Sequence, residues 1–355
     1  MAPLAETVSS DLPAALLLHR LDIKKLVVFR ALQVGDMLCA VPTLRSLRAG
    51  FPEANITLVS LPWAKEFAAR FNNYLDDFVA FPGHPQFPEQ PAQESTLPTF
   101  YQEMRARHFD LAVQIHGNGQ ISNQIINEFG AKIRVGFTRK GSAEIHSRSF
   151  PAYPETGAEP LRLLTLTTSL GTPFLGTDLE FPLTADDFSE LNASGIASGL
   201  TEDNYICIHA GARIRSKCWA PTQFAKVGDQ LSKEFGLPIV LTGSGKEMDL
   251  TAAVAAQMQT KAINAASPIS IGAMAALMSG ARLLICNDTG VSHIAAGLKL
   301  PSVVIFSTAD MTRWAPLNHI LHRCISDPNG EKAAEIIEQA RCLLTAHGKD
   351  QRLTP

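Results

Sequence analysis

The chain has 355 residues, 46% of them hydrophobic, which exceeds the usual size of one domain and predicts two. Its formal net charge of −3 provides no overall basic field, which argues against nucleic acid as a partner. There is no run long enough for a membrane span, no visible signal peptide and no C-x-x-C pair among the six cysteines, so we expect a cytoplasmic protein with reduced thiols.

The first half alternates strand-like and helical stretches after an extension at 1–22. Strands are expected at 26–29, 56–60, 78–81, 111–115 and 133–136, and helices at 39–48, 63–71 and 100–107. Strands separated by helices predict parallel β-α-β units with right-handed crossovers.

The alternation stops between 171 and 199, where Pro, Gly and polar residues predict a linker region. After it we expect strands at 205–209, 238–242, 283–286 and 302–306, and helices at 222–234, 248–258, 271–279, 293–298 and 331–346. We therefore expect one α/β domain at 23–175, a second at 176–330, and a C-terminal helix and tail at 331–355. Ligands of such sheets bind beyond the carboxyl ends of the strands.

Asp36 follows the first expected strand, at or near the start of a helix. A carboxylate at this position can cap the helix, which is worth about 1 kcal/mol. It can also serve as a general base that accepts the proton of an attacking hydroxyl. Its position alone leaves both interpretations open.

Small and cationic residues follow the expected strands 205–209 and 238–242. Gly211, Arg213 and Lys217 suit either a phosphate-bearing ligand or a solvated basic loop. Gly243 precedes Glu247, whose carboxylate suits a ribose or is simply an acid in the first turn of a helix. This stretch is not a P-loop, because Glu247 stands where that motif requires Ser or Thr.

Asp288, Thr289 and Gly290 open a helix that carries His293 in its first turn. The amide groups and dipole of a helix N-terminus favour an anion such as phosphate. Each residue alone fits a helix cap or a core histidine equally well. Three phosphate-compatible loops at the strand ends of one sheet together predict a nucleotide site.

No D-x-D, H-E-x-x-H or Cys/His cluster is present, which favours a mechanism without a metal and without a cofactor. Gly117 and Gly119 begin a dinucleotide fingerprint that Ser122 leaves incomplete, so a dehydrogenase is disfavoured.

The chain resembles glycosyltransferase family 9, the ADP-heptose:lipopolysaccharide heptosyltransferases, over about residues 24–317. The resemblance is carried by Gly35-Asp36 with Pro42, "FDLAVQIHGNGQISN" with "RVGF", "HAGARIRSKCW", "TGSGKE", "NDTGVSH" and "RWAP". It implies a GT-B fold, in which two Rossmann-like α/β domains with parallel sheets face a central cleft. It also implies inverting transfer of a sugar from a nucleotide-diphosphate donor to a saccharide or glycolipid acceptor.

Carried over to this chain, the resemblance makes Asp36 the general base and Lys217 the group that neutralises the diphosphate. Glu247 would bind the ribose of the donor. The donor pocket would be lined by Asp288, Thr289, Gly290 and His293. Members of the family act on lipid-linked saccharides at the inner face of the membrane, so the resemblance also implies peripheral membrane contact.

The chain departs from the family pattern at several positions. Ala220 stands where proline is common, and Ser307 and Ala309 replace a usual glycine and threonine. Ile121 replaces a basic residue before Ser122. Two other functions stay open: a nucleotide-sugar epimerase of GT-B-like fold, and a non-catalytic protein that binds a nucleotide sugar.

Overall fold

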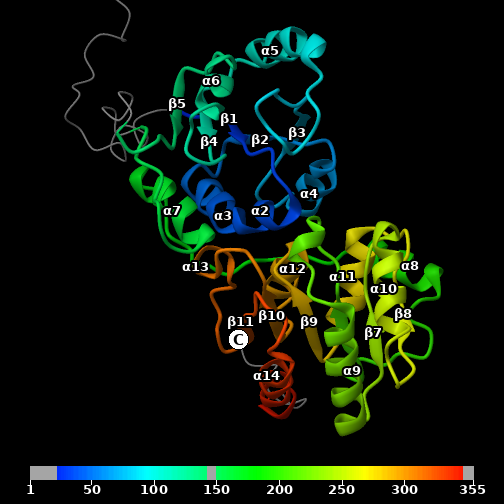
Figure 1. Ribbon diagram of the computed structural model, residues 1–355. Coiled ribbons are helices and arrows are strands. Elements are labelled where there is room, and N and C mark those ends of the chain that lie inside the picture. The colour runs from blue at the N-terminus through cyan, green and yellow to red at the C-terminus, as the bar shows by residue number, and fades with distance from the viewer. Residues whose placement is uncertain (1–21, 142–148, 347–355) are drawn as a thin grey trace, which may run out of the picture. The chain divides into compact units, whose positions relative to one another are not determined.

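The computed structural model describes residues 22–141 and 149–346 (Figure 1). The expected N-terminal extension at 1–22 lies outside the described residues except for Asp22. The chain divides into two compact units, Met1–Thr177 (unit 1) and Asp178–Pro355 (unit 2). Each unit is a parallel α/β sheet, which confirms the predicted fold class.

Within the described residues, unit 1 has a five-stranded sheet of order β3-β2-β1-β4-β5. Its strands are β1 (Lys25–Phe29), β2 (Asn55–Ser60), β3 (Asp77–Ala80), β4 (Leu111–Gln114) and β5 (Ile133–Gly136). Its helices are α2 (Val34–Cys39), α3 (Val41–Gly50), α4 (Ala64–Arg70), α5 (Leu97–Ala106), α6 (Ser122–Asn127) and α7 (Glu159–Ser169). The strand order reverses between β1 and β4, so this is the topological switch point of unit 1.

Alternating side chains of β1 fill the two faces of this sheet. Val27 and Phe29 join a cluster with residues of α5 and α6 and with Phe129. Leu26 and Val28 are equally buried and point to the opposite face, because successive strand residues alternate. Burial on both faces explains why the strands read as continuous apolar runs.

The part of unit 2 that the structure describes forms a six-stranded sheet of order β11-β10-β9-β6-β7-β8. Its strands are β6 (Ile206–His209), β7 (Ile239–Leu241), β8 (Ile263–Asn264), β9 (Leu283–Asn287), β10 (Ser302–Phe306) and β11 (His322–Ser326). Its helices are α8 (Ala185–Ser194), α9 (Pro221–Phe235), α10 (Met248–Ala255), α11 (Ile271–Ser279), α12 (Gly290–Gly297), α13 (Met311–Trp314) and α14 (Ala333–Ala346). The switch point of this sheet lies between β6 and β9.

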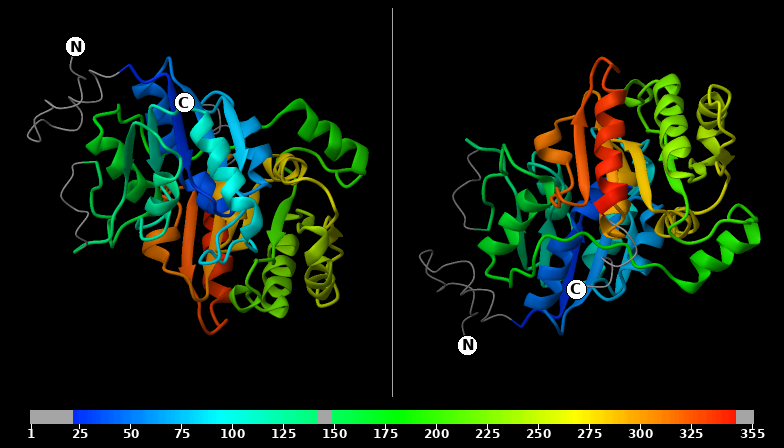
Figure 2. Two further views of the ribbon diagram at one scale, coloured as in Figure 1. Left: turned by 90° about the horizontal axis from the view of Figure 1, so that it is seen from above. Right: turned by 90° about the horizontal axis from the view of Figure 1, so that it is seen from below.

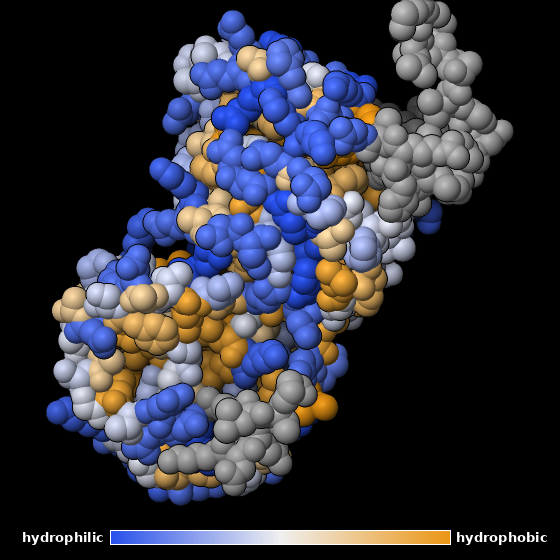
Figure 3. Space-filling view, turned by 180° about the vertical axis from the view of Figure 1, so that it is seen from behind, coloured by the Kyte–Doolittle hydropathy of each residue, from blue (hydrophilic) through white to orange (hydrophobic). Residues whose placement is uncertain are grey.

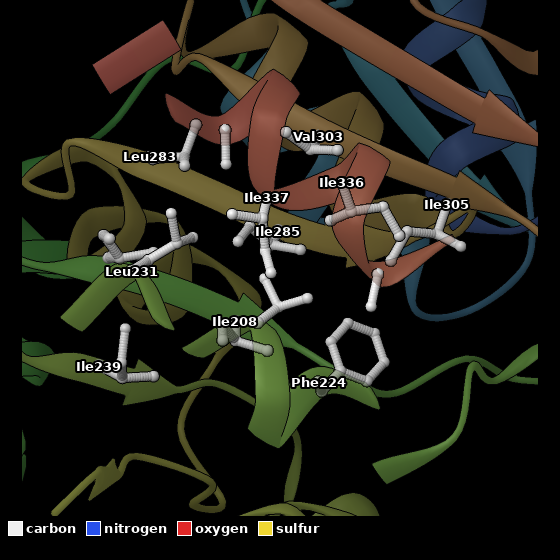
Figure 4. Packing of buried hydrophobic residues seen from close by; sticks show 14 of the residues in the cluster. Ile208, Phe224, Leu231, Ile239, Leu283, Ile285, Val303, Ile305, Ile336 and Ile337 are labelled. Carbon is white, nitrogen blue, oxygen red and sulfur yellow. The ribbon is translucent and has the colours of Figure 1, made fainter. Parts of the chain in front are cut away.

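The C-terminal helix α14 packs beside α9 on one side of the unit 2 strands (Figure 2). Ile336 and Ile337 of α14 meet side chains from α9 and from the central strands in one buried cluster (Figure 4). The cluster includes Ile208, Ile285 and Ile305, which project from three neighbouring strands toward these helices.

One helix prediction and the linker prediction differ from the structure in detail. The single helix expected at 39–48 is two helices, α2 and α3, joined at Ala40. Pro42 has no amide hydrogen to donate to the carbonyl four residues earlier, so it fits the first turn of a new helix, where it is the second residue of α3. The expected linker region at 171–199 contains α8, which starts at a capping box between Thr184 and Asp187 and ends at Gly195 in the left-handed conformation.

Candidate functional site

Two loops meet at the switch point of unit 2, one after β6 and one after β9. The Lys217 ammonium, in the 3-10 turn η3 (Arg215–Lys217), lies 3.6 Å from a carboxylate oxygen of Asp288. Asp288 is buried and Lys217 is partly exposed. The structure therefore brings together two of the predicted donor-binding residues, at the sheet edge where α/β proteins bind ligands.

The loop that carries Lys217 is held in place by side chains from three other segments. Asn287 at the end of β9 accepts from the Trp219 amide (2.9 Å) and donates to the Ala210 carbonyl (2.7 Å). The Ser307 hydroxyl donates to the Lys217 carbonyl at 3.0 Å. The Trp219 indole donates to Asp327 at 2.9 Å. Asn287 lies within the motif "NDTGVSH", but the sequence alone assigned it no role.

Glu247 ends the turn η4 (Gly245–Glu247) and forms a capping box with Ser244. One carboxylate oxygen accepts from the Ser244 amide (2.8 Å) and hydroxyl (2.7 Å). The other oxygen lies 3.8 Å from the His209 ring. A β-carbon at Gly211 would lie 1.9 Å from that oxygen, so a larger residue would displace the carboxylate from this position.

Glu247 and His209 differ in charge at neutral pH. Burial lowers the pKa of His209, which keeps the ring neutral against the opposing effect of Glu247. Burial alone would raise the pKa of Glu247, but the hydrogen bonds from the Ser244 hydroxyl and amide favour the charged form, and the pKa is lowered. Glu247 is thus an oriented carboxylate beside the glycine loop, a geometry suited to accepting from hydroxyl groups.

The helix α12 begins at Gly290, with Thr289 as its N-cap residue. The Thr289 side chain makes no capping hydrogen bond within the described residues, whereas its carbonyl accepts from the Ser292 hydroxyl at 2.7 Å. His293 is buried one turn into the helix, its ring edge-on to Trp314 at 6.3 Å between centroids. The amide end of α12 thus lies at the same loop as Asp288.

The other candidate phosphate-loop residues are placed differently. The space beside Gly243 is limited by the Glu247 side chain, 3.3 Å from a β-carbon built there. Arg213 is exposed, and the structure records no ion pair between it and a described residue. Its neighbour Arg215 instead binds Asp249 of α10 at 2.9 and 3.0 Å.

In unit 1, Asp36 is the third residue of α2, and Gln33 is the N-cap. The capping interpretation of Asp36 is therefore wrong. Arg30, with no exposed surface, donates to the Asp36 carbonyl at 3.1 Å and also to the carbonyl of Ile115. The same guanidinium binds the buried Glu159 of α7 at 3.2 Å.

Arg30 therefore fixes the first turn of α2 against the end of β4 at the switch point of unit 1. Sequence reasoning missed Arg30 and Glu159, which are separated by 129 residues in the chain. The only sequence signal for this pair is an arginine directly after an apolar strand, and that signal does not indicate which residue the arginine binds.

Among residues 22–141 and 149–346, no group of three His, Cys, Asp or Glu side chains is arranged to hold a metal ion. No helix in these ranges is long and apolar enough to cross a bilayer.

On the face seen in Figure 3, hydrophilic residues cover most of unit 1, and hydrophobic residues are exposed over part of unit 2.

Two doubly wound parallel sheets, with loops from the switch point of each as candidate sites, match the GT-B class of glycosyltransferase folds. The model of glycosyltransferase family 9 (heptosyltransferase) matches residues 98–342. Lipopolysaccharide heptosyltransferase 3 of Escherichia coli K12 is 26% identical over 298 residues, or 79% of this chain and 82% of that protein. Lipopolysaccharide heptosyltransferase 2 of Salmonella typhimurium is 24% identical over 311 residues, or 83% of this chain and 86% of that protein.

Two solved structures share the fold. A family 9 glycosyltransferase from Veillonella parvula superposes with a TM-score of 0.78 at 20% identity, covering 92% of this chain and 99% of that one. ADP-heptose lipopolysaccharide heptosyltransferase II of E. coli gives 0.72 at 19% identity, covering 91% and 99%. The chain belongs to glycosyltransferase family 9, and it is a glycosyltransferase.

Proposed function

We propose that this glycosyltransferase moves a heptose from ADP-heptose to a hydroxyl of a lipopolysaccharide core saccharide or a related cell-envelope glycan, with inversion at the anomeric carbon. The observation that carries the proposal is the Lys217–Asp288 pair beside the amide end of α12, in a chain of family 9. Relatives named as lipopolysaccharide heptosyltransferases support heptose as the transferred sugar and lipopolysaccharide as the acceptor class.

Unit 2 binds the donor in this proposal. Lys217 exchanges its partner Asp288 for the diphosphate, whose charge also suits the first amide groups of α12. Glu247 accepts hydrogen bonds from the ribose, and Thr289, Gly290 and His293 line the sugar-phosphate end of the pocket. Gly211 and Gly243 keep the loops close to Glu247, while the exposed Arg213 is free to approach phosphate.

Unit 1 supplies the base. The Asp36 carboxylate takes the proton of the acceptor hydroxyl as its oxygen bonds to the anomeric carbon. The bond between that carbon and the diphosphate oxygen breaks on the opposite side, which inverts the configuration. The leaving diphosphate carries negative charge, which Lys217 and the α12 amides stabilise.

The enzyme acts at the cytoplasmic face of the membrane, in peripheral contact with its lipid-linked acceptor.

The base assignment is tested with Asp36→Ala and Asp36→Asn. We expect each to lower transfer from ADP-heptose to deacylated core oligosaccharide by at least about 100-fold, because general-base catalysis contributes at least that much. The rise in Tm caused by ADP should stay as in the parent enzyme, since Asp36 belongs to unit 1 and the proposed donor-binding residues belong to unit 2. Lys217→Ala is the matched contrast and should lose most of the ADP-induced rise in Tm.

Full turnover by Asp36→Ala would eliminate this residue as the base. Incubation of ADP-heptose without acceptor distinguishes a transferase from an epimerase, because an epimerase alters the donor sugar by itself.

A further inference from the structure

His116 lies at the switch point of unit 1, two residues beyond β4, and the proposed function gives it no role. The backbone ladder between β1 and β4 ends with the Ile115 amide donating to the Phe29 carbonyl at 3.2 Å. One step further, the Ala31 amide donates to the Nδ1 atom of His116 at 3.1 Å. The imidazole thus takes the place of a backbone acceptor at the end of the strand pair.

This contact determines the tautomer of the ring. An Nδ1 atom that accepts a hydrogen bond carries no proton, so the neutral ring has its proton on Nε2. Burial and the nearby Arg30 guanidinium lower the pKa of His116 to about 3, so the ring is neutral at physiological pH. His116 can therefore donate one hydrogen bond from Nε2 and has no lone pair left for use as a base.

The ring cannot easily turn away from this orientation. Phe29 stacks on it at 5.4 Å between centroids, and Phe87 stacks on it at 4.4 Å. The backbone is also held, because the His116 amide donates to Gln114 (2.6 Å) and its carbonyl accepts from Ser122 (2.8 Å). Stacking on both neighbours leaves only the edges of the imidazole for polar contacts.

The Nε2 atom, at the other polar edge of the ring, has no hydrogen-bond partner among the described residues, and His116 is partly exposed. A side chain needed only to accept from Ala31 would not require this second polar atom. The backbone next to His116 is also linked to that of the proposed base, because Arg30 donates hydrogen bonds to the carbonyls of both Ile115 and Asp36.

We propose that the Nε2–H group of His116 binds an oxygen of the acceptor saccharide and helps to place its reacting hydroxyl for Asp36. This inference rests on the proposed function and adds an acceptor-binding residue to it. A fixed neutral donor suits a sugar hydroxyl, since it binds an oxygen lone pair without attracting anions in general.

The test compares two substitutions at this position with a distant control. His116→Asn keeps an amide oxygen near the position of Nδ1 but has no donor near Nε2, whereas His116→Gln keeps an N–H there. With deacylated core oligosaccharides as acceptors, we expect His116→Asn to lower kcat/KM for the acceptor about five- to tenfold, the loss of one neutral hydrogen bond. The KM for ADP-heptose should not change, and His116→Gln should restore much of the loss.

His108→Asn is the matched control, because His108 is exposed at the opposite end of β4 and its positive φ suits asparagine. It should change neither constant. An unchanged acceptor kcat/KM in His116→Asn overturns the inference while leaving the proposed function intact. Equal losses in both His116 variants, in step with lower Tm, would mean that the ring is only structural.

A second measurement does not depend on any substrate. The nitrogen chemical shifts of His116, assigned by their absence in His116→Asn, should report an Nε2–H tautomer that does not titrate between pH 8 and about 5. An Nδ1–H tautomer, or an ordinary titration near pH 6.5, would refute the inference. Absence of any heptosyl transfer by the parent enzyme would instead count against the proposed function, and the chemical shifts would still test His116.

Discussion

A single methyl group would disturb the contact between Gly211 and Glu247. The β-carbon of alanine would lie 1.9 Å from a carboxylate oxygen of Glu247 and 3.1 Å from the His209 ring. Two hydrogen bonds from Ser244 hold the other oxygen of this carboxylate, so displacement of the group would disturb them.

We predict that Gly211→Ala weakens ADP binding at least about tenfold, because Glu247 would be displaced from its orientation. Isothermal titration of ADP measures the effect. Gly245→Ala is the control, since a β-carbon there has only ordinary contacts at 3.6 Å or more. Equal affinity of the Gly211 variant and the control would show that the position of Glu247 does not matter for the nucleotide.

Ser307 shows how a departure from the family pattern acts at the scale of one residue. The family usually has glycine at this position, which offers no side chain. Here the Ser307 hydroxyl binds the Lys217 carbonyl, so the departure supports the loop that carries a proposed donor-binding cation.

At the scale of elements, α7 is joined to the start of α2 by the buried pair of Glu159 and Arg30. Tyr153 also donates to the Glu159 carboxylate at 2.9 Å, and Arg162 lies 3.8 Å from it. Removing one partner of a buried pair leaves an uncompensated charge, which costs far more than removing an exposed pair.

We predict that Glu159→Ala lowers the free energy of unfolding by about 3–5 kcal/mol, because the Arg30 charge would remain buried without its partner. Urea denaturation measures the loss. Glu128→Ala, which removes the half-exposed pair of Glu128 and Arg105, should cost less than about 1 kcal/mol. A loss of that small size for Glu159→Ala would show that water reaches Arg30 in the folded protein.

Local sequence signals succeeded for strands with continuous apolar runs, but they missed the helices α7 and α8 and two short strands. The continuous apolar runs of β1 and β9 predicted buried strands, as the structure confirms. The strand β11, with the sequence HRCIS, was missed because only one of its residues is aliphatic, and β8 has only two residues. Pairing with β10 and β7 makes these segments strands, and no local pattern encodes that pairing.

At the scale of the whole molecule, both units contain a histidine that is kept neutral. The pKa of His116 in unit 1 is lowered to about 3 by burial and Arg30. The pKa of His322 in unit 2 is lowered to about 4 by burial and by the nearby His293 and His319. His322 is buried and its Nδ1 atom lies 2.8 Å from the Ser302 hydroxyl.

We predict that Tm falls as the pH decreases from about 6.5 toward 4.5. In this range the unfolded chain binds protons at both histidines, with an ordinary pKa near 6.5, whereas the folded protein does not, so acid favours unfolding. The stability these groups contribute is complete above about pH 6.5. The lowered pKa values of Asp110, Asp229 and Asp327 act at lower pH, below about 4.

Calorimetry across this range measures the effect, and His322→Gln should flatten the dependence of Tm on pH. A Tm that stays constant between pH 7 and 4.5 in the parent protein would contradict the prediction.

The sequence by itself determined the two parallel α/β sheets and which residues follow each strand, because strand and helix periodicity and the composition of strand ends are local properties. It thereby placed Asp36, Lys217, Glu247 and Asp288 at sheet edges where ligands bind. Only the tertiary structure decided which of these side chains meet and what holds them. The pairs Arg30–Glu159, Trp219–Asp327 and His116–Phe87 join segments far apart in the chain, and such contacts follow from the packing of whole elements rather than from any local pattern.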